Sequence, residues 1–218
     1  NQDSLIEYNR FGTQSPLRGE AILLTSTIDN VIRNNVISNS ADGIVLQNNA
    51  SFNTIVGNLI GTAADGSSPL GNEEFGIHLQ GGASDNKIRG TNPGEANVIA
   101  FNREVGIYLQ DDTTIGNRIL NNSIYSNVRF GINLHDSDEN RRVNFSGNSG
   151  FITPNDAGDA DEGPNQFQNF PVITNVRLQG TNVAIDGTLN SLPSASYGIE
   201  FFSTGNISRL GQGQFFLG

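Results

Sequence analysis

The sequence predicts an all-β fold: a parallel β-helix with three short strands per coil, followed by a partial antiparallel β-sandwich. The main observation is a motif, Gly-Ile-x-Leu, that occurs four times along the chain. Its copies are Gly43–Leu46, Gly76–Leu79, Gly106–Leu109 and Gly131–Leu134. A unit that returns every 25–33 residues is typical of stacked repeat proteins.

The second observation is a pair of Asn-x-Ile motifs before each copy of Gly-Ile-x-Leu. These motifs begin at Asn30 and Asn35, Asn53 and Asn58, Asn86 and Asn97, and Asn117 and Asn122. Apolar and polar residues alternate within each motif, as in a strand with one buried face. We therefore expect three strands per coil, each pairing with its counterpart one coil away at a spacing of about 4.8 Å.

Stacking of the coils predicts ladders of identical residues. The expected internal ladders are Ile44, Ile77, Ile107 and Ile132; Leu46, Leu79, Leu109 and Leu134; and Ile37, Ile60, Ile99 and Ile124. The asparagines suit sharp corners, because Asn tolerates left-handed backbone angles. Hydrogen bonds from coil to coil are expected along Asn35, Asn58, Asn97 and Asn122. A helical fold is excluded because no segment has apolar spacing of 3.6 and Gly and Asn are too dense.

The motif pattern divides the chain into three parts. We assign residues 1–154 to the β-helix, with an imperfect first coil up to about residue 28 in which Ile22–Leu24 take the place of Ile-x-Leu. Residues 155–171 form an acidic junction, and residues 172–218 a β-sandwich module. Expected strands of that module are 172–178, 183–189, 197–202 and 214–217. So few strands leave a sheet edge open, and we expect the module to be incomplete or completed by a partner strand.

Composition narrows the classes of function. The chain has 218 residues, a net charge of −10 and no cysteine. Disulfides and thiolate sites are therefore excluded, and no basic face for nucleic acid is evident. No apolar run approaches the ~18 residues of a membrane span. The acidic, lysine-poor composition favours an extracellular or cell-surface location.

Several segments resemble a known group of proteins. Residues 57–72 (GNLIGTAADGSSPLGN) and 88–102 resemble loops of large bacterial right-handed parallel β-helix repeat proteins. Residues 156–171 resemble the junction that leads into their sandwich module. The resemblance implies a right-handed coil in a secreted or surface-attached protein. A cysteine-containing loop of that family is shortened here, at residues 203–211.

The outward positions of the Gly-Ile-x-Leu strands form a candidate carbohydrate-binding face. These positions form two columns that run from coil to coil; the first column starts at Val45 and the second at Gln47. The candidate residues are His78, Gln80, Tyr108, Gln110, Asn133 and His135. Such side chains can hydrogen-bond to sugars and stack on them. The alternative is a solvated sheet face with paired polar ladders.

An acidic corner is the candidate catalytic site. Asp111 and Asp112 leave one coil where His135, Asp136 and Asp138 leave the next. Crowded carboxylates raise one another's pKa, so that one can act as general acid while another activates water. Lyases of this architecture use a basic residue, for which the candidates are Lys87, Arg141 and Arg142. The alternative is a polar turn.

The acidic junction is a candidate calcium site. Asp156, Asp159, Asp161 and Glu162 lie within seven residues, and carboxylate oxygens are the ligands that Ca²⁺ prefers. The alternative is a solvated acidic linker.

Together these observations predict an extracellular structural or adhesive protein. Its expected partners are polysaccharide or other copies of itself, with polymerisation through sheet edges. The alternative function is a carbohydrate-active enzyme, either a polysaccharide lyase or a glycoside hydrolase, that uses the acidic corner.

Overall fold

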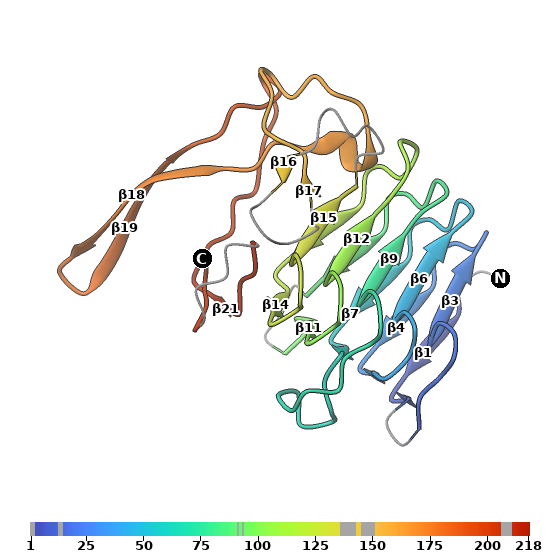
Figure 1. The fold of residues 1–218 in the computed structure, drawn as a ribbon. Coiled ribbons are helices and arrows are strands. Elements are labelled where there is room, and N and C mark those ends of the chain that lie inside the picture. Colours follow the sequence, from blue (N-terminus) through green and yellow to red (C-terminus); the bar gives the residue numbers. More distant parts are fainter. Residues whose placement is uncertain are drawn as a thin grey trace.

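The computed structural model describes residues 3–12, 15–90, 92, 94–135, 143–144, 151–205 and 211–218. The regular secondary structure of the described chain is almost entirely β-strand, and the first part of the chain forms three parallel sheets of five strands each. Along the chain, a strand of the first sheet is followed by one of the second and one of the third. This order repeats, so that the chain winds through five coils (Figure 1). This arrangement is the predicted parallel β-helix with three strands per coil.

The three sheets are named here in the order in which the chain enters them. Sheet 1 consists of β1 (Leu5–Glu7), β4 (Val31–Arg33), β7 (Thr54–Val56), β10 (Lys87–Arg89) and β13 (Arg118–Leu120). Sheet 2 consists of β2 (Arg10–Phe11), β5 (Val36–Ile37), β8 (Leu59–Ile60), β11 (Val98–Ala100) and β14 (Ser123–Tyr125). Sheet 3 consists of β3 (Ile22–Thr25), β6 (Ile44–Gln47), β9 (Ile77–Leu79), β12 (Ile107–Leu109) and β15 (Ile132–Leu134).

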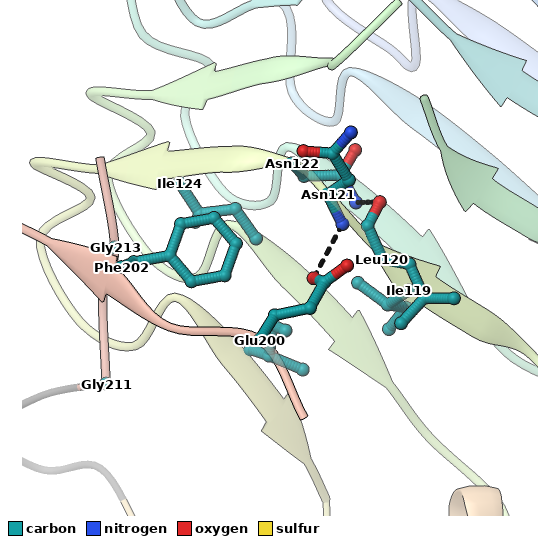
Figure 2. A pocket seen from close by; sticks show the side chains of 10 residues that line it. Ile119, Leu120, Asn121, Asn122, Ile124, Glu200, Phe202, Gly211 and Gly213 are labelled. Atoms are coloured by element: carbon teal, nitrogen blue, oxygen red, sulfur yellow. Dashed lines mark hydrogen bonds between the residues drawn. The ribbon is translucent and has the colours of Figure 1, made fainter. Parts of the chain in front are cut away.

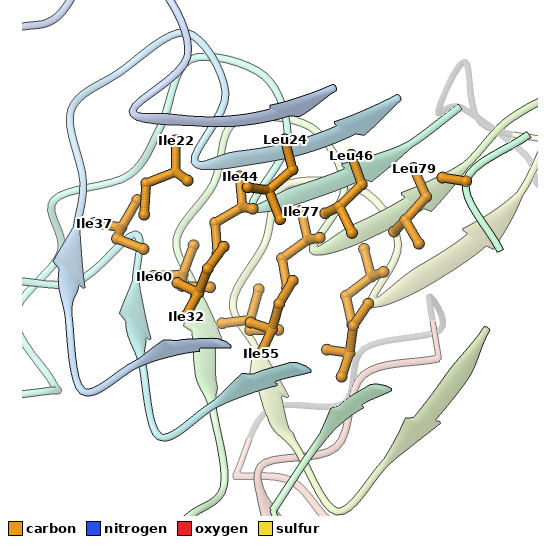
Figure 3. Close-up of a cluster of buried hydrophobic side chains, with 14 of the residues drawn as sticks. Ile22, Leu24, Ile32, Ile37, Ile44, Leu46, Ile55, Ile60, Ile77 and Leu79 are labelled. Carbon is orange, nitrogen blue, oxygen red and sulfur yellow. The ribbon is translucent and has the colours of Figure 1, made fainter. Parts of the chain in front are cut away.

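The register of sheet 3 confirms the predicted ladders. Ile44 lies opposite Ile22 on one side and Ile77 on the other, and Leu46 and Leu79 follow in the same way. The imperfect first coil is therefore also confirmed. These side chains fill the interior of the coil (Figure 3). No single coil can bury them alone, so the core is stable only as a stack.

The repeated glycine is required by the distance between coils. A Cβ atom on Gly76 would lie 2.6 Å from the carbonyl oxygen of Gly106 and 2.7 Å from Cγ2 of Ile99. The same close approach occurs at Gly43, where a Cβ would lie 2.4 Å from the Gly76 oxygen. Real side chains do not tolerate such contacts. The motif begins with Gly because the backbone of the next coil occupies the space of a side chain.

Buried asparagines form three ladders along the coil corners. In each ladder, the side-chain oxygen of one Asn accepts hydrogen bonds from its counterpart in the preceding coil. Asn53, for example, donates from its backbone N and from Nδ2 to Oδ1 of Asn86, at 3.0 Å each. The ladders are Asn30, Asn53, Asn86 and Asn117; Asn35, Asn58, Asn97 and Asn122; and Asn72, Asn102 and Asn127.

The second of these ladders was predicted, and its hydrogen bonds confirm it. The third was missed, although the sequence contains its signal. Asn72, Asn102 and Asn127 each stand four residues before the glycine of a Gly-Ile-x-Leu motif. This spacing places them at the corner that leads into sheet 3.

The remainder of the described chain forms small antiparallel pairs and one short helix. The elements are β16 (Val143–Asn144), β17 (Phe151–Ile152), the 3-10 helix η1 (Pro164–Phe167), β18 (Val172–Gln179), β19 (Asn182–Thr188), β20 (Phe202–Ser203) and β21 (Phe215–Phe216). The pairs are β16–β17, β18–β19 and β20–β21. Antiparallel pairing is thus confirmed, but each pair is a separate two-stranded sheet among the described residues. Of the strand expected at 197–202, only Phe202 lies in a strand.

The β18–β19 hairpin projects away from the coils (Figure 1) and has one apolar face. Its register places Val176 opposite Ile185 and Leu178 opposite Val183. An irregularity between Ile173 and residue 175 adds one residue to β18, so Ile173 joins this same face. Leu178 is 82% exposed, which shows that the described chain leaves the face uncovered.

Candidate functional site

The outward column of sheet 3 is largely covered. Val45, His78 and Asn133 are buried, with exposed fractions of 2%, 8% and 8%. Tyr108 is partly buried, and its ring stacks on Phe75 with a centroid distance of 4.4 Å. The face therefore presents Tyr108 to solvent while His78 and Asn133 lie beneath the surface.

His78 belongs to a buried cluster on this face. Its ring packs edge-on against Phe75, at a centroid distance of 5.0 Å. Nδ1 of His78 lies 3.7 Å from Oδ2 of Asp42, whose other oxygen accepts the backbone N–H of Phe75 at 3.0 Å. Nε2 of His78 is buried and has no hydrogen-bond partner among the described residues. The contacts of Phe75 with His78 and Asp42 hold the loop before β9 against the sheet.

The second column forms a polar ribbon along the same sheet. We use the name Gln ribbon for Gln47, Gln80, Gln110 and His135, all of them partly exposed. Gln80 donates from Nε2 to Oε1 of Gln47 at 3.1 Å. The ring of His135 lies 5.4 Å from that of Tyr108. The amides are thus in line across successive coils and continue into an aromatic pair.

One residue of the acidic corner, Asp111, stabilises a neighbouring turn. Asp111 is exposed and has a positive φ of 75°, and its Oδ2 accepts the backbone N–H of Gly81 at 2.7 Å. It therefore stabilises the turn of the preceding coil. Asp112 is exposed. Asp136, Asp138 and the basic candidates Arg141 and Arg142 lie outside the residues that the structure describes.

The acidic junction brings three carboxylates together. Oxygens of Asp156, Asp159 and Asp161 all lie within 4.8 Å of one another. Asp159 is buried, the other two are partly buried, and Glu162 is exposed. Glu162 is not part of the group. Three oxygens at this spacing can coordinate a hard cation such as Ca²⁺.

Asn169 holds this junction together and was not predicted. Its backbone N–H donates to Oδ1 of Asp159 at 2.7 Å, and its Oδ1 accepts the N–H of Asp156 at 3.0 Å. Its Nδ2 donates to the carbonyl oxygens of Asp156 and Asn190, at 2.9 and 2.7 Å. The hydroxyl of Ser191 donates to the second oxygen of Asp159. The carboxylates are therefore fixed to two distant segments of the chain.

Two side chains from beyond the coil close its C-terminal end. Oδ1 of Asn165 accepts the N–H of Asn117 at 2.9 Å, and its Nδ2 donates to the Asn117 carbonyl at 2.7 Å. Oε1 of Gln212 accepts the N–H of Asn127 at 2.9 Å. Each amide takes the place that the next ladder asparagine would have in a sixth coil. They satisfy backbone groups that would otherwise lack partners.

A groove lies between the last coil and the C-terminal segment. It has a volume of about 570 Å³ and is lined by Ile132 and Leu134 of β15 and by Phe170, Tyr197 and Ile199 across from them. Ile132 is 39% exposed, so part of the coil interior faces this groove.

A smaller pocket of about 120 Å³ shares several residues with the groove (Figure 2). Glu200 crosses it to accept the backbone N–H of Asn121 at 2.7 Å (Figure 2). Phe202 and Ile124 also line this pocket (Figure 2). The C-terminal segment is thus attached to the coil end by a charged hydrogen bond.

Comparison with known proteins identifies the fold but no close relative. A family model described as "Right handed beta helix region" matches residues 1–93. This part spans the first three coils and β10 of the fourth, and the two remaining coils continue in the same register. The fold is a right-handed parallel β-helix. Neither the curated proteins nor the solved structures compared with this chain contain a significant match.

Among the described residues, no helix has the length and apolarity that a bilayer span requires.

Proposed function

We propose that this chain is an extracellular structural and adhesive module that contacts polysaccharide through the Gln ribbon. The observation that supports the proposal is the line of partly exposed amides on sheet 3, which runs from coil to coil beside Tyr108. Each amide offers donors and acceptors to sugar hydroxyls, and an aromatic ring offers a face for stacking. The buried ladders beneath make the ribbon a rigid surface, which lowers the entropic cost of binding.

The test is binding to a panel of immobilised polysaccharides, measured by biolayer interferometry. We expect at least one glycan to bind, and the double variant Gln80→Ala/Gln110→Ala to weaken that binding severalfold. The matched control is Gln179→Ala, because Gln179 is exposed on the hairpin far along the chain. Binding that survives the double variant unchanged would remove the Gln ribbon from the proposal. Release of reducing ends from the bound glycan would instead favour the enzymatic alternative.

We also propose that the acidic junction binds Ca²⁺ and stiffens the link between the coil and the C-terminal segment. The close approach of three carboxylates supports this, because a cation relieves their mutual repulsion. The test compares two variants, Asp161→Asn and Glu162→Gln. Only Asp161→Asn removes one of the three clustered carboxylates. We expect calcium to raise the melting temperature of the wild type and of Glu162→Gln but not of Asp161→Asn. Calorimetric titration that detects no calcium binding would contradict the proposal.

The proposed structural role does not require a second copy of the chain to stack on the C-terminal end of the coil. Asn165 and Gln212 of the same chain already bond to that end. Self-association through other sheet edges remains a separate prediction. Electron microscopy with and without a calcium chelator tests this prediction. Ordered filaments would support self-association, and dispersed particles would contradict it.

A further inference from the structure

The β18–β19 hairpin begins at the rim of the groove at the coil end. Phe170 and Pro171 line that groove, and β18 starts at the next residue, Val172. The hairpin then projects away from the coils (Figure 1). The described chain therefore has an uncovered apolar strand face beside an open groove. We call the first of these the hairpin face, which consists of Ile173, Val176, Leu178, Val183 and Ile185.

The groove also presents apolar side chains that the described chain leaves partly uncovered. Ile132 is 39% exposed, and Phe170 and Ile199 are 47% and 44% exposed. Of its two charged lining residues, Glu200 already accepts the backbone N–H of Asn121 at 2.7 Å, and Arg118 is exposed. A volume of about 570 Å³ is within the range that takes in several apolar groups. The groove thus suits aliphatic side chains.

Hydrogen bonds at the base of the hairpin keep it away from its own groove. Asn155 holds the residue before β18 region: its Nδ2 donates to the Phe170 carbonyl at 2.8 Å, and its Oδ1 accepts the Phe170 N–H at 3.0 Å. After β19, the carbonyl of Asn190 accepts Nδ2 of Asn169 at 2.7 Å, and Oδ1 of Asn190 accepts the N–H of Gly158 at 3.2 Å. Folding the hairpin back onto its own groove would break these bonds.

The distribution of charge favours a second copy of the chain as the occupant. The whole chain has a net charge of −10, so two copies repel each other over most of their surface. The hairpin contains only two charged residues, Arg177 and Asp186, and they pair with each other on the face opposite the hairpin face. Contact through the hairpin face therefore brings no like charges together, and the face has no carboxylate that would attract a basic partner.

The area of the hairpin face indicates how two copies meet. Four of its five side chains are 54–82% exposed, which corresponds to about 250 Å² if a free aliphatic side chain offers roughly 100 Å². Two such faces packed on each other would bury about 500 Å², less than the ~1,000 Å² of a specific interface. If each face lies in the groove of the other copy, the groove surfaces are added and the total approaches that size.

We propose that two copies form a closed two-fold dimer in which the hairpin face of each copy lies in the groove of the other. Because each groove is at the base of a hairpin, two antiparallel hairpins place each tip beside the partner's groove. So small an interface predicts a dissociation constant of about 10–100 μM, and dilute chains are then monomers with an uncovered hairpin. The dimer closes after two copies, unlike a filament, and it does not rest on the proposed contact with polysaccharide.

Sedimentation equilibrium tests the proposal at concentrations on both sides of the expected dissociation constant. We expect wild-type chains to pass from monomer to dimer and no further. Leu178→Gln changes the hairpin face and Ile199→Thr changes the groove, and each should raise the dissociation constant about tenfold. The matched control is Leu23→Gln, because Leu23 is a 46% exposed leucine of β3 in the first coil. It should change the constant less than twofold. Circular dichroism and thermal melting establish that each variant is folded.

A mixture of the two variants tests whether the contact is reciprocal. In either variant alone, both contacts of the dimer contain a changed surface. In the mixture, the intact hairpin of Ile199→Thr meets the intact groove of Leu178→Gln, so one of the two contacts is restored. We therefore expect the mixed pair to associate more tightly than either variant does with itself.

Three outcomes would overturn the proposal. The first is a chain that stays monomeric at every concentration. If Leu178→Gln then still lowers the free energy of unfolding as much as a core substitution, the hairpin occupies its own groove. The second is dimerisation that Ile199→Thr leaves unchanged, which would mean that the hairpin faces pack directly on each other. The third is growth beyond two copies, which would show an open contact instead of a two-fold one.

Discussion

The five coils and the segment after them use the same kinds of residue with opposite results. In the coils, isoleucine that points inward from a strand is buried completely, as Ile55 and Ile77 show. In the β18–β19 hairpin, Ile173 and Val176 are 54% and 58% exposed although they also lie in a strand. The two regions differ in what packs against them. Each coil covers the next, whereas each hairpin strand pairs with one antiparallel partner and no other part of the described chain covers the apolar face. Burial in this protein comes from repetition of the unit.

The largest expected effect is loss of a core residue from the middle of the stack. Ile77→Ala should lower the free energy of unfolding by about 2–5 kcal/mol, because it leaves a cavity among fully buried side chains. Leu178→Ala in the hairpin should change it by no more than about 0.5 kcal/mol, since Leu178 is 82% exposed. Urea unfolding followed by circular dichroism measures both. Equal effects would show that something covers the hairpin in solution.

The ladder asparagines provide a second contrast, between the inside of the stack and its end. Asn86→Ala removes the acceptor of two hydrogen bonds from Asn53 and a donor to the Ala50 carbonyl. Each buried group left without a partner costs about 1–3 kcal/mol. Asn165→Ala removes partly buried hydrogen bonds to Asn117, and water can replace them, so a loss of about 1 kcal/mol is expected. Thermal and urea unfolding should rank the two variants in this order.

The coils and the segment after them also differ in the space around their glycines. Gly76→Ala places a Cβ 2.6 Å from the backbone oxygen of Gly106, and we expect a loss of about 1–3 kcal/mol from this overpacking. Gly198→Ala should be neutral or slightly stabilising, because no described atom outside Gly198 and its two chain neighbours lies within 4 Å of the Cβ position. The comparison of melting temperatures is direct. A tolerant Gly76 would mean that neighbouring coils can move apart locally.

The same contrast explains how much of the fold was predictable. The Ile, Leu and Asn ladders could be aligned from the sequence because each coil repeats its residues at corresponding positions, as Ile44 and Ile77 do. The function of the motif glycine could not be found in this way, since it depends on the distance of the next backbone. The hairpin strands could be predicted from alternation alone. Their exposure could not, because alternation gives the faces of a strand but not what covers them.

Candidate sites were harder to predict for a related reason. Alternation placed His78 and Asn133 on the outward face correctly, but the loop containing Phe75 covers part of that face. The acidic junction could be found because its carboxylates are close in sequence. The hydrogen bonds of Asn169 join segments 13 and 21 residues apart. No short sequence pattern contains such contacts.

The smallest expected effect concerns a loop inserted into the coils. One side chain of this loop bonds to its own turn, whereas the side-chain bonds of the hairpin run between its two strands. Asp65 accepts hydrogen bonds from the backbone N–H groups of Ser67 and Ser68, at 2.9 and 2.8 Å, and from the Ser68 hydroxyl. The Ser68 hydroxyl is the main cause that lowers the pKa of Asp65 to about 2. Because the folded pKa lies below that of the unfolded chain, these bonds stabilise the loop above the ordinary carboxyl pKa. Their contribution is lost as pH falls toward 2.

Carbon-detected NMR titration of the Asp65 carboxyl group measures this shift. We expect Ser68→Ala to move the pKa of Asp65 upward, toward its usual value, while the coils remain folded. Tyr125 is a second reporter, because burial and the charge of Asp65 both raise its pKa. Asp65→Asn should therefore lower the pKa of Tyr125, with the hydrogen bond from its hydroxyl to the Gly66 carbonyl retained. An Asp65 pKa that does not respond to Ser68→Ala would mean that backbone N–H groups alone hold the loop. The loop would then differ further from the hairpin, in which the side chains of Asn175 and Arg177 bond to the Asp186 carboxylate on the opposite strand.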